Sequence, residues 1–184
     1  VGPAPGMITL GNLTRTVPVT ISRTSVTPIM AFSVTFSISP QLDLSGGLSG
    51  IHEGTYLITA NPTTSFNLIN LGTDGAGNDN YQADCTTLGP PCGSSAATGT
   101  LFTIDLSSLA LAGTGTVTIT EIKFRDCANA DLPSTIGTSS SVSIDQSVPV
   151  VHVTSPNGSE TWPIGTSQTI AWTGSDLEGI VSYD

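Results

Sequence analysis

Residues 30–39 read Met-Ala-Phe-Ser-Val-Thr-Phe-Ser-Ile-Ser, and this stretch decides the fold. Every even position carries a large apolar side chain, whereas every odd position carries a small or hydroxylated one. Successive side chains of a β-strand point to opposite faces, so the segment predicts a strand with one hydrophobic and one wettable face. Another apolar layer must cover the hydrophobic face, and the rest of the chain offers only further strands. The stretch therefore predicts the centre of a β-sandwich.

The flanking sequence supplies more segments with the same alternation. Residues 16–22 contain Pro18, which cannot donate a hydrogen bond to a sheet and so predicts a sheet edge or a bulge. The apolar positions of residues 116–125 change parity, which predicts a bulge near Thr120 and Glu121. With turn residues between them, about nine short strands and no helical period predict an all-β, nine-stranded jelly-roll sandwich.

Other segments complete this expectation. A long hairpin is predicted because two apolar segments flank a loop rich in Gly, Asp and Asn. We expect one helical turn at most, and only at residues 106–111. The remaining expected elements are the hairpin strands at 66–71 and 81–88, and single strands at 7–10, 54–60, 100–106 and 142–145.

Composition narrows the classes of partner. The 184 residues include 4 basic and 14 acidic side chains, which gives a net charge of -10, and only 10% of residues are charged. Such an acidic chain is repelled by nucleic acid and by anionic lipid. No apolar segment approaches the roughly 20 residues needed to cross a bilayer, so we expect no membrane insertion. The hydroxyl-rich, lysine-poor surface is typical of a secreted or cell-surface protein.

Five segments together carry a resemblance to a known family: Thr16-Val-Pro-Val-Thr-Ile, Ala31-Phe-Ser-Val-Thr-Phe-Ser-Ile, Gly99-Thr-Leu-Phe-Thr-Ile-Asp105, Thr118-Ile-Thr-Glu-Ile-Lys-Phe-Arg-Asp126 and Leu132-Pro133. Their order resembles that of a cohesin module from a bacterial secreted protein. The resemblance covers residues 7–145 and implies a domain at 1–146. It implies a nine-stranded jelly roll used for non-covalent recognition, with dockerin modules as the partners of true cohesins.

A second resemblance concerns residues 147–184, which we expect to form a linker and the N-terminal strands of an incomplete domain. The segments Val153-Thr-Ser-Pro-Asn-Gly-Ser-Glu-Thr-Trp162 and Gly165-Thr-Ser-Gln-Thr-Ile-Ala-Trp172 resemble the opening of a bacterial immunoglobulin-like repeat. The first strands of such a sandwich expose edges that favour pairing between chains. Strand exchange into a fibre is therefore one hypothesis for this region.

Three cysteines, in a composition typical of secreted proteins, predict one disulfide and one remaining thiol. Pairing Cys85 with Cys92 closes a short loop and stabilises by roughly 2.5 kcal/mol, against roughly 4 kcal/mol for Cys85 with Cys127. We favour Cys85 with Cys92 because Gly89-Pro-Pro favours a tight reversal between them. Cys127 is then either a small buried apolar residue or an intermolecular link.

The loop of the predicted hairpin is the candidate metal site. Carboxylate and amide oxygens on a flexible loop suit calcium, although the spacing is not that of an EF-hand. The alternative is a solvated hairpin tip in which Asn and Gly supply left-handed turn residues. The candidate ligands are Asp74, Asn78, Asp79, Asn80 and Asp84.

No catalytic site is expected, because the sequence lacks the motifs of nucleophilic, metallohydrolase and phosphate-binding sites. His52, beside Glu53, is either a general base or a surface histidine, and the second interpretation is favoured. His152 is expected on the outer face of a strand. Aromatic residues make up 5% of the chain, which disfavours a sugar-binding groove.

A carbohydrate-binding module remains the alternative function, with Tyr56 and Tyr81 as the candidate stacking pair. Asn12 and Asn157 begin Asn-x-Ser/Thr sequons and are candidate glycosylation sites. The favoured function is a non-catalytic, extracellular module for protein recognition or structural assembly, such as a cell-surface scaffold, adhesin or fibre subunit. Its partners are other proteins or copies of itself, with polysaccharide as the alternative, and calcium is the candidate cofactor.

Overall fold

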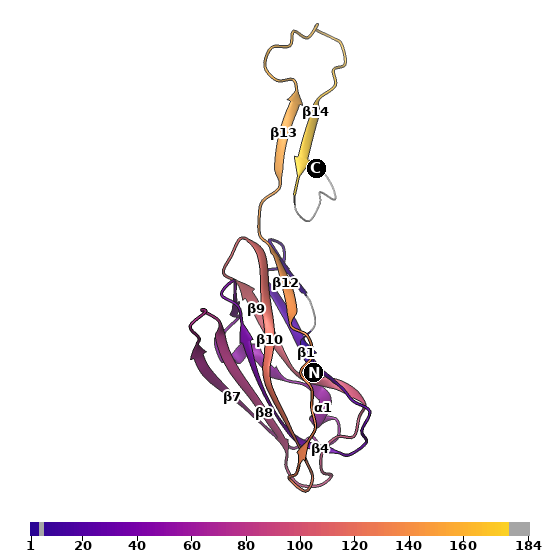
Figure 1. The fold of residues 1–184 in the computed structure, drawn as a ribbon. Coiled ribbons are helices and arrows are strands. Elements are labelled where there is room, and N and C mark those ends of the chain that lie inside the picture. Colours follow the sequence, from indigo (N-terminus) through magenta and orange to yellow (C-terminus); the bar gives the residue numbers. More distant parts are fainter. Residues whose placement is uncertain (4–5, 177–184) are drawn as a thin grey trace.

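The structure is a computed structural model that describes residues 1–3 and 6–176, and nearly all regular structure in these residues is β-strand (Figure 1). The elements are β1 (Gly2–Pro3), β2 (Gly6–Thr9), β3 (Thr14–Ser22), β4 (Ile29–Ile38), β5 (Leu42–Leu44), the 3-10 helix η1 (Gly47–Gly50), β6 (Ile51–Glu53), α1 (Thr55–Ile58), β7 (Thr64–Thr73), β8 (Asp79–Thr87), β9 (Thr98–Ser108), β10 (Ala112–Asp126), β11 (Asp131–Leu132), β12 (Ser140–Asp145), β13 (Val150–Ser155) and β14 (Ala171–Ser175).

Two sheets pack face to face and enclose one apolar core. The smaller sheet has the order β1-β3-β9-β5, with β6 also paired to β9. The larger sheet has the order β2-β12-β10-β4-β8-β7, with β11 paired to β10. Eight of the nine expected strands overlap a strand of the structure, namely β2, β3, β4, β7, β8, β9, β10 and β12, whereas the expected strand at 54–60 does not. The predicted all-β jelly-roll sandwich is confirmed.

Strand β4 lies inside the larger sheet, between β10 and β8. Phe32, Val34, Phe36 and Ile38 are buried, as the alternation predicted. Met30 differs, because a register shift against β10 opposite residues 29–31 turns Ile29 into the core and leaves Met30 only half-buried. The rings of Phe36 and Phe102 lie 5.5 Å apart and join the two sheets through the core.

The predicted irregularities of the strands are largely present. The register between β10 and β4 shifts between Ile119 and Glu121, which confirms the bulge. The register between β3 and β9 shifts between Val19 and Thr20, next to Pro18. In the described residues β1 pairs only with Val19 and Thr20 of β3. Pro18 therefore lies just outside this pairing, where its missing N–H costs no hydrogen bond to β1.

Two local predictions are wrong. Residues 54–60 form no strand, because the chain turns at Gly54 and then forms α1. A Cβ at Gly54 would lie 2.3 Å from the carbonyl oxygen of Thr100, so only glycine allows this close approach. The consecutive residues Tyr56 and Leu57 are both buried, which one helical turn allows and a strand does not. Residues 106–111 contain no helical turn, because β9 continues to Ser108.

Beyond β12 the chain forms a separate two-stranded ribbon, which projects from one end of the sandwich (Figure 1). Strands β13 and β14 pair antiparallel, and most of their side chains are exposed. The expected boundary at residues 146–147 falls between β12 and β13 and stays a prediction. The final residues of the expected immunoglobulin-like repeat, 177–184, lie outside the described part of the chain.

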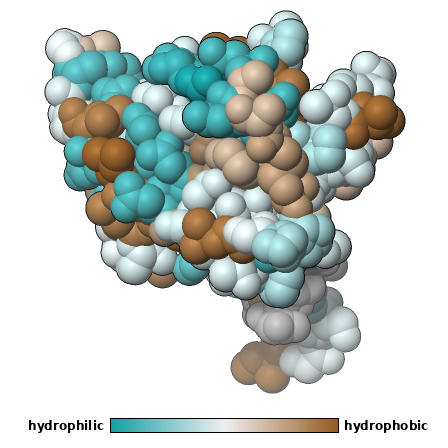
Figure 2. Space-filling view, turned by 90° about the horizontal axis from the view of Figure 1, so that it is seen from below, coloured by the Kyte–Doolittle hydropathy of each residue, from teal (hydrophilic) through white to brown (hydrophobic). Residues whose placement is uncertain are grey.

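The surface at the lower end of the sandwich mixes polar and apolar residues (Figure 2). Figure 2 views the molecule from below and shows pale and teal residues over much of this end, with brown apolar residues in separate groups between them. In the residues that the structure describes, no helix has the length and apolar character required to span a membrane.

Candidate functional site

The side of the larger sheet that points away from the core carries rows of mainly polar side chains. Alternate residues of β10, β4 and β8 fill the core, and those at the start of β7 are partly buried at its border, so the residues between them form a continuous outer surface. Pairing between the strands aligns these residues in rows across the sheet. We call this surface the outer face, and its rows are Arg125–Ala31–Thr86–Ser65, Lys123–Ser33–Asp84–Asn67 and Glu121–Thr35–Gln82–Ile69.

Charges of both signs lie on the outer face. Lys123 and Arg125 are two of the four basic residues of the chain, and both project from β10. The Nζ atom of Lys123 lies 2.7 Å from Glu121, which raises the pKa of Lys123 above its ordinary value. Across the sheet, the side chain of Gln82 donates hydrogen bonds of 2.9 Å to both carboxylate oxygens of Asp84. The outer face therefore carries charged and polar side chains that are held in place by contacts with one another.

A shallow hollow lies on the outer face. It is lined by Ser33 at its centre, by Lys123 and Arg125 on one side, and by Asn67 and Asp84 on the other. None of these five residues has its side chain in the core. The hollow is wide and open, so it suits a side chain of a docked protein better than an enclosed small substrate.

The disulfide differs from the predicted one. Cys92 and Cys127 form the bond, with their Cα atoms 5.9 Å apart, so the pairing of Cys85 with Cys92 is wrong. Cys127 is exposed and neither a buried apolar residue nor a free link to another chain. The physical reason lies in the sheet: β8 and β10 both run antiparallel to β4, so their C-terminal ends lie at the same end of it. Cys92 and Cys127 follow these two ends.

Cys85 is the free thiol and lies in the core. Its Sγ atom donates a hydrogen bond of 3.2 Å to Glu53, which reaches it from β6 in the opposite sheet. Burial, followed by this hydrogen bond, raises the pKa of the Cys85 thiol well above its ordinary value. The reactive thiolate is therefore suppressed.

We expect iodoacetamide at about pH 8 to leave Cys85 unmodified in the folded protein and to alkylate it in denaturant. Burial blocks access to the thiol, and its raised pKa removes the thiolate that would react. Mass spectrometry of the intact chain measures the modification. Fast alkylation of the folded protein would contradict the burial of this residue.

The predicted stacking tyrosines do not form a ligand platform. Tyr56 and Tyr81 are only 3% and 6% exposed. The hydroxyl of Tyr56 donates a 3.1 Å hydrogen bond to the carbonyl of Ala96, while the ring of Tyr81 packs 5.7 Å from that of Phe36. Both rings are buried in the core or at its border and are not accessible to a ligand, so the sugar-stacking role predicted for them is wrong.

The candidate calcium ligands are divided by the hairpin. Asp74 closes the β7–β8 turn by accepting hydrogen bonds from the backbone of Ala76 and from the backbone and side chain of Asn78. These bonds, with that of the Asn78 side chain first, hold the pKa of Asp74 below its ordinary value. Asp79 accepts a 2.6 Å hydrogen bond from Thr73. The structure thus gives these carboxylates a role in the turn.

Asp84 does not join the other candidate ligands, because it lies five residues along β8 from Asp79, about 17 Å away. Asn80 donates its side-chain hydrogen bonds to the backbone carbonyls of Gly72 and Asn78. Among the residues described, no group of three or more His, Cys, Asp or Glu side chains could hold a metal ion. Calcium binding stays a prediction, and this donor set does not fit it well.

His52 lies on the outer side of the smaller sheet, where it shares Asp105 with Thr16. Its Nε2 atom is 2.9 Å from one carboxylate oxygen of Asp105, and Thr16 donates a 2.5 Å hydrogen bond to the other. The bond from Thr16, followed by the contacts of His52, holds the pKa of Asp105 below its ordinary value. The carboxylate separates the hydroxyl from the imidazole, so the group is no nucleophile–base pair.

The remaining predicted residues are all exposed. His152 is exposed on β13, as expected for the outer face of a strand. Asn12 lies in the turn before β3, and Asn157 lies beyond β13, and both are accessible. Their modification stays a prediction.

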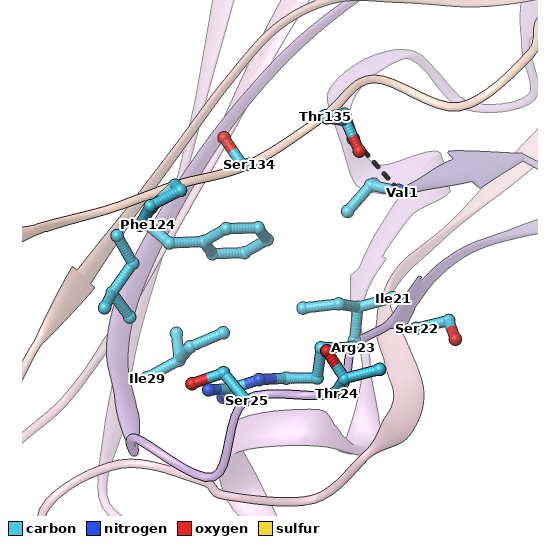
Figure 3. A pocket seen from close by; sticks show the side chains of 12 residues that line it. Val1, Ile21, Ser22, Arg23, Thr24, Ser25, Ile29, Phe124, Ser134 and Thr135 are labelled. Carbon is cyan, nitrogen blue, oxygen red and sulfur yellow. Dashed lines mark hydrogen bonds between the residues drawn. The ribbon is translucent and has the colours of Figure 1, made fainter.

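A pocket opens between the two sheets at one end of the sandwich (Figure 3). Ile21, Ile29 and Phe124 point into it, and the side chain of Arg23 runs along one side. The guanidinium of Arg23 donates hydrogen bonds to the hydroxyl of Tyr56 and to the carbonyl of Ser94. Among the described residues that line the pocket, none is a carboxylate, a histidine or a thiol, and its polar side chains are hydroxyls and the Arg23 guanidinium.

The sequence did not reveal Lys123, Arg125 and Asp84 as neighbours on one surface. Their parity along each strand is visible in the sequence, but their proximity depends on the pairing of β10 with β4 and of β4 with β8. The parity change in β10 was the signal that could have placed Lys123 on the outer face.

Comparison with known proteins gives a result only at the level of structure. No family model matches the chain, and no curated protein matches its sequence. Solved structures do match, and the similarity covers the sandwich.

Three of the similar structures, all of them cohesin modules, show the extent of the likeness. The sixth cohesin of scaffoldin B from Acetivibrio cellulolyticus, solved in complex with a Cel5 dockerin mutant, has a TM-score of 0.60 at 15% identity, over 78% of this chain and 96% of the cohesin. A non-cellulosomal cohesin from Archaeoglobus fulgidus has a TM-score of 0.55 at 12% identity, over 78% and 88% of the two chains. The cohesin module of a Clostridium perfringens family 33 glycoside hydrolase has a TM-score of 0.58 at 11% identity, over 78% and 93%. The chain therefore has the cohesin fold, a jelly-roll β-sandwich.

Proposed function

We propose that this chain is a non-catalytic, extracellular module that recognises another protein through the outer face of β10, β4, β8 and β7. The observation that carries the proposal is this broad surface, which combines fixed charges of both signs with small hydroxylated residues. A partner can approach such a surface closely, since Ala31, Ser33 and Thr35 at its centre are all short. Mixed charges at its border favour a specific orientation of the partner.

The class of partner follows from the structural neighbours. Cohesins of Acetivibrio cellulolyticus and Clostridium thermocellum were solved in complex with dockerins. A dockerin-like module is therefore the first partner to test for this chain. We further propose that the module belongs to a longer secreted or cell-surface scaffold, in which residues 147–184 begin an immunoglobulin-like repeat. The antiparallel ribbon β13–β14 supports that second step.

Ser33→Arg is expected to weaken binding of a cognate dockerin by about 100-fold, because a long charged side chain in the central hollow keeps the partner from the sheet. Isothermal titration calorimetry against a panel of dockerin modules measures this effect. The matched control is Thr103→Arg, on the outer side of the smaller sheet, which should leave affinity unchanged. Equal losses in both variants, or a loss in the control alone, would contradict the proposed face.

A further inference from the structure

Strand β7 is the longest open strand edge of the sandwich. The other edges are short or interrupted: β1 has two residues, β2 has four, and β5 and β6 have three each. Strand β7 has ten residues and, in the described part of the chain, pairs only with β8 (Figure 1). An open strand of this length presents unpaired backbone groups to any second strand.

The hydrogen-bond pattern shows which backbone groups are free. The N–H of Leu88 donates to the carbonyl of Thr63, so residues 63 and 88 form a hydrogen-bonded pair just before β7 begins. Such pairs recur at every second residue of an antiparallel ladder, so in this register the odd residues of β7 bond to β8. Alternate residues of an antiparallel edge strand point their N–H and C=O groups away from the sheet. In this register the residues that do so are Thr64, Phe66, Leu68 and Asn70.

The composition of β7 leaves this edge poorly protected. Natural edge strands carry charged residues, Pro or bulges that block pairing. Residues 64–70 contain neither charge nor Pro, and the register shift against β8 occurs only beyond them, between Asn70 and Gly72. On the inner side, Phe66 and Leu68 are only partly buried against the core. A second strand at this edge would therefore cover apolar surface and form backbone hydrogen bonds.

We propose that β7 pairs antiparallel with β7 of a second copy of this chain and joins the two larger sheets into one. The register that uses all four free residues sets Thr64 opposite Asn70 and Phe66 opposite Leu68, and the two-fold axis then passes beside Asn67. Each of these four pairs exchanges two hydrogen bonds, about eight in total. Phe66 and Leu68 of each copy meet their counterparts on the inner side, which covers the partly buried apolar surface at the edge.

The antiparallel orientation limits the repulsion between two copies that each carry a net charge of -10. The antiparallel arrangement places the two Asp74 hairpin tips at opposite ends of the joined strands, about 48 Å apart. This separation far exceeds the Debye length of about 8 Å, so the tips do not repel each other. A parallel arrangement would place both tips side by side.

Cysteine cross-linking tests the register. Asn67→Cys should form a disulfide between two copies under mild oxidation, because residue 67 faces itself at a non-hydrogen-bonded pair with a Cα separation of about 4.5 Å. Ser65→Cys is the matched control: residue 65 faces residue 69 of the other copy, so it should not cross-link. Cross-linking of both variants would contradict the antiparallel register, and cross-linking of neither would contradict the pairing.

Charged substitutions at the axis give a second test. Sedimentation velocity at protein concentrations between about 1 and 500 μM measures dimerisation. The wild type should dimerise with rising concentration, whereas Asn67→Asp and Asn67→Lys should each weaken dimerisation about tenfold, because like charges then face each other. An equimolar mixture of the two variants should restore it. The N–H of Leu68 points away from β8, so Leu68→Pro removes it and leaves the hydrogen bonds between β7 and β8 in place. This variant should weaken dimerisation about 10- to 100-fold.

A wild type that stays monomeric throughout this range would overturn the proposal, as would a dimer that persists in all three variants. A monomeric chain that binds an unrelated extended peptide at β7 would also overturn self-pairing and assign the edge to another protein. These results do not depend on dockerin binding, because Ser33→Arg leaves the β7 edge intact and its effect is measured separately.

Discussion

Phe36→Ala is expected to lower the free energy of unfolding by about 3–5 kcal/mol. Phe36 is fully buried, and its ring lies 5.5 Å from Phe102 in the opposite sheet and 5.7 Å from Tyr81 in its own sheet. Truncation removes the contacts that join the two layers and leaves a cavity that rigid neighbouring strands cannot close. Urea denaturation followed by circular dichroism measures the loss.

The matched control for this change is Thr35→Ala, one residue away on the outer face. Its side chain lies outside the core, so its removal should change stability by about 0.5 kcal/mol or less. A similar loss in both variants would show that β4 does not alternate between core and surface.

Reduction of the Cys92–Cys127 disulfide is expected to lower the free energy of unfolding by about 2–4 kcal/mol. The bond joins residues 35 positions apart in the sequence and so restricts the unfolded chain strongly. Denaturation with and without a phosphine reductant measures the difference, and Cys127→Ser should reproduce it.

Cys85→Ala provides the control that separates the two possible pairings. If Cys92 bonds to Cys127, this variant keeps its full sensitivity to reductant. If the bond instead joined Cys85 to Cys92, the variant would lose that sensitivity, and the observed connectivity would be wrong.

The sequence predicted most of the sandwich because two-residue periodicity is a local property. Alternation in residues 30–39 located β4, and the parity change in β10 located its bulge. Local alternation failed at Gly54, where the close approach of the chain to Thr100 in β9 favours a helical turn. That contact joins distant parts of the chain, so no window of sequence contains it.

The predicted grouping of some site residues was wrong for a similar reason. Sequence spacing suggested that Cys85 and Cys92 are close, whereas the order of strands in the sheet brings Cys127 to Cys92. Asp84 was grouped with the hairpin tip by its acidity, although its place on β8 puts it in a row with Lys123. The outer face depends on register, and register is set only when the strands assemble.

The parallel pairing of β2 with β12 has a mechanical consequence. The two strands lie side by side in the larger sheet, although β2 comes early and β12 comes last in the part of the chain that forms the sandwich. The N–H of Leu10 also donates to the carbonyl of Asp145. Tension applied before β2 and after β12 pulls the two strands in opposite directions along their own axes. The load then acts in shear on all their hydrogen bonds together instead of opening them one at a time, so this short ladder resists stretching of the module.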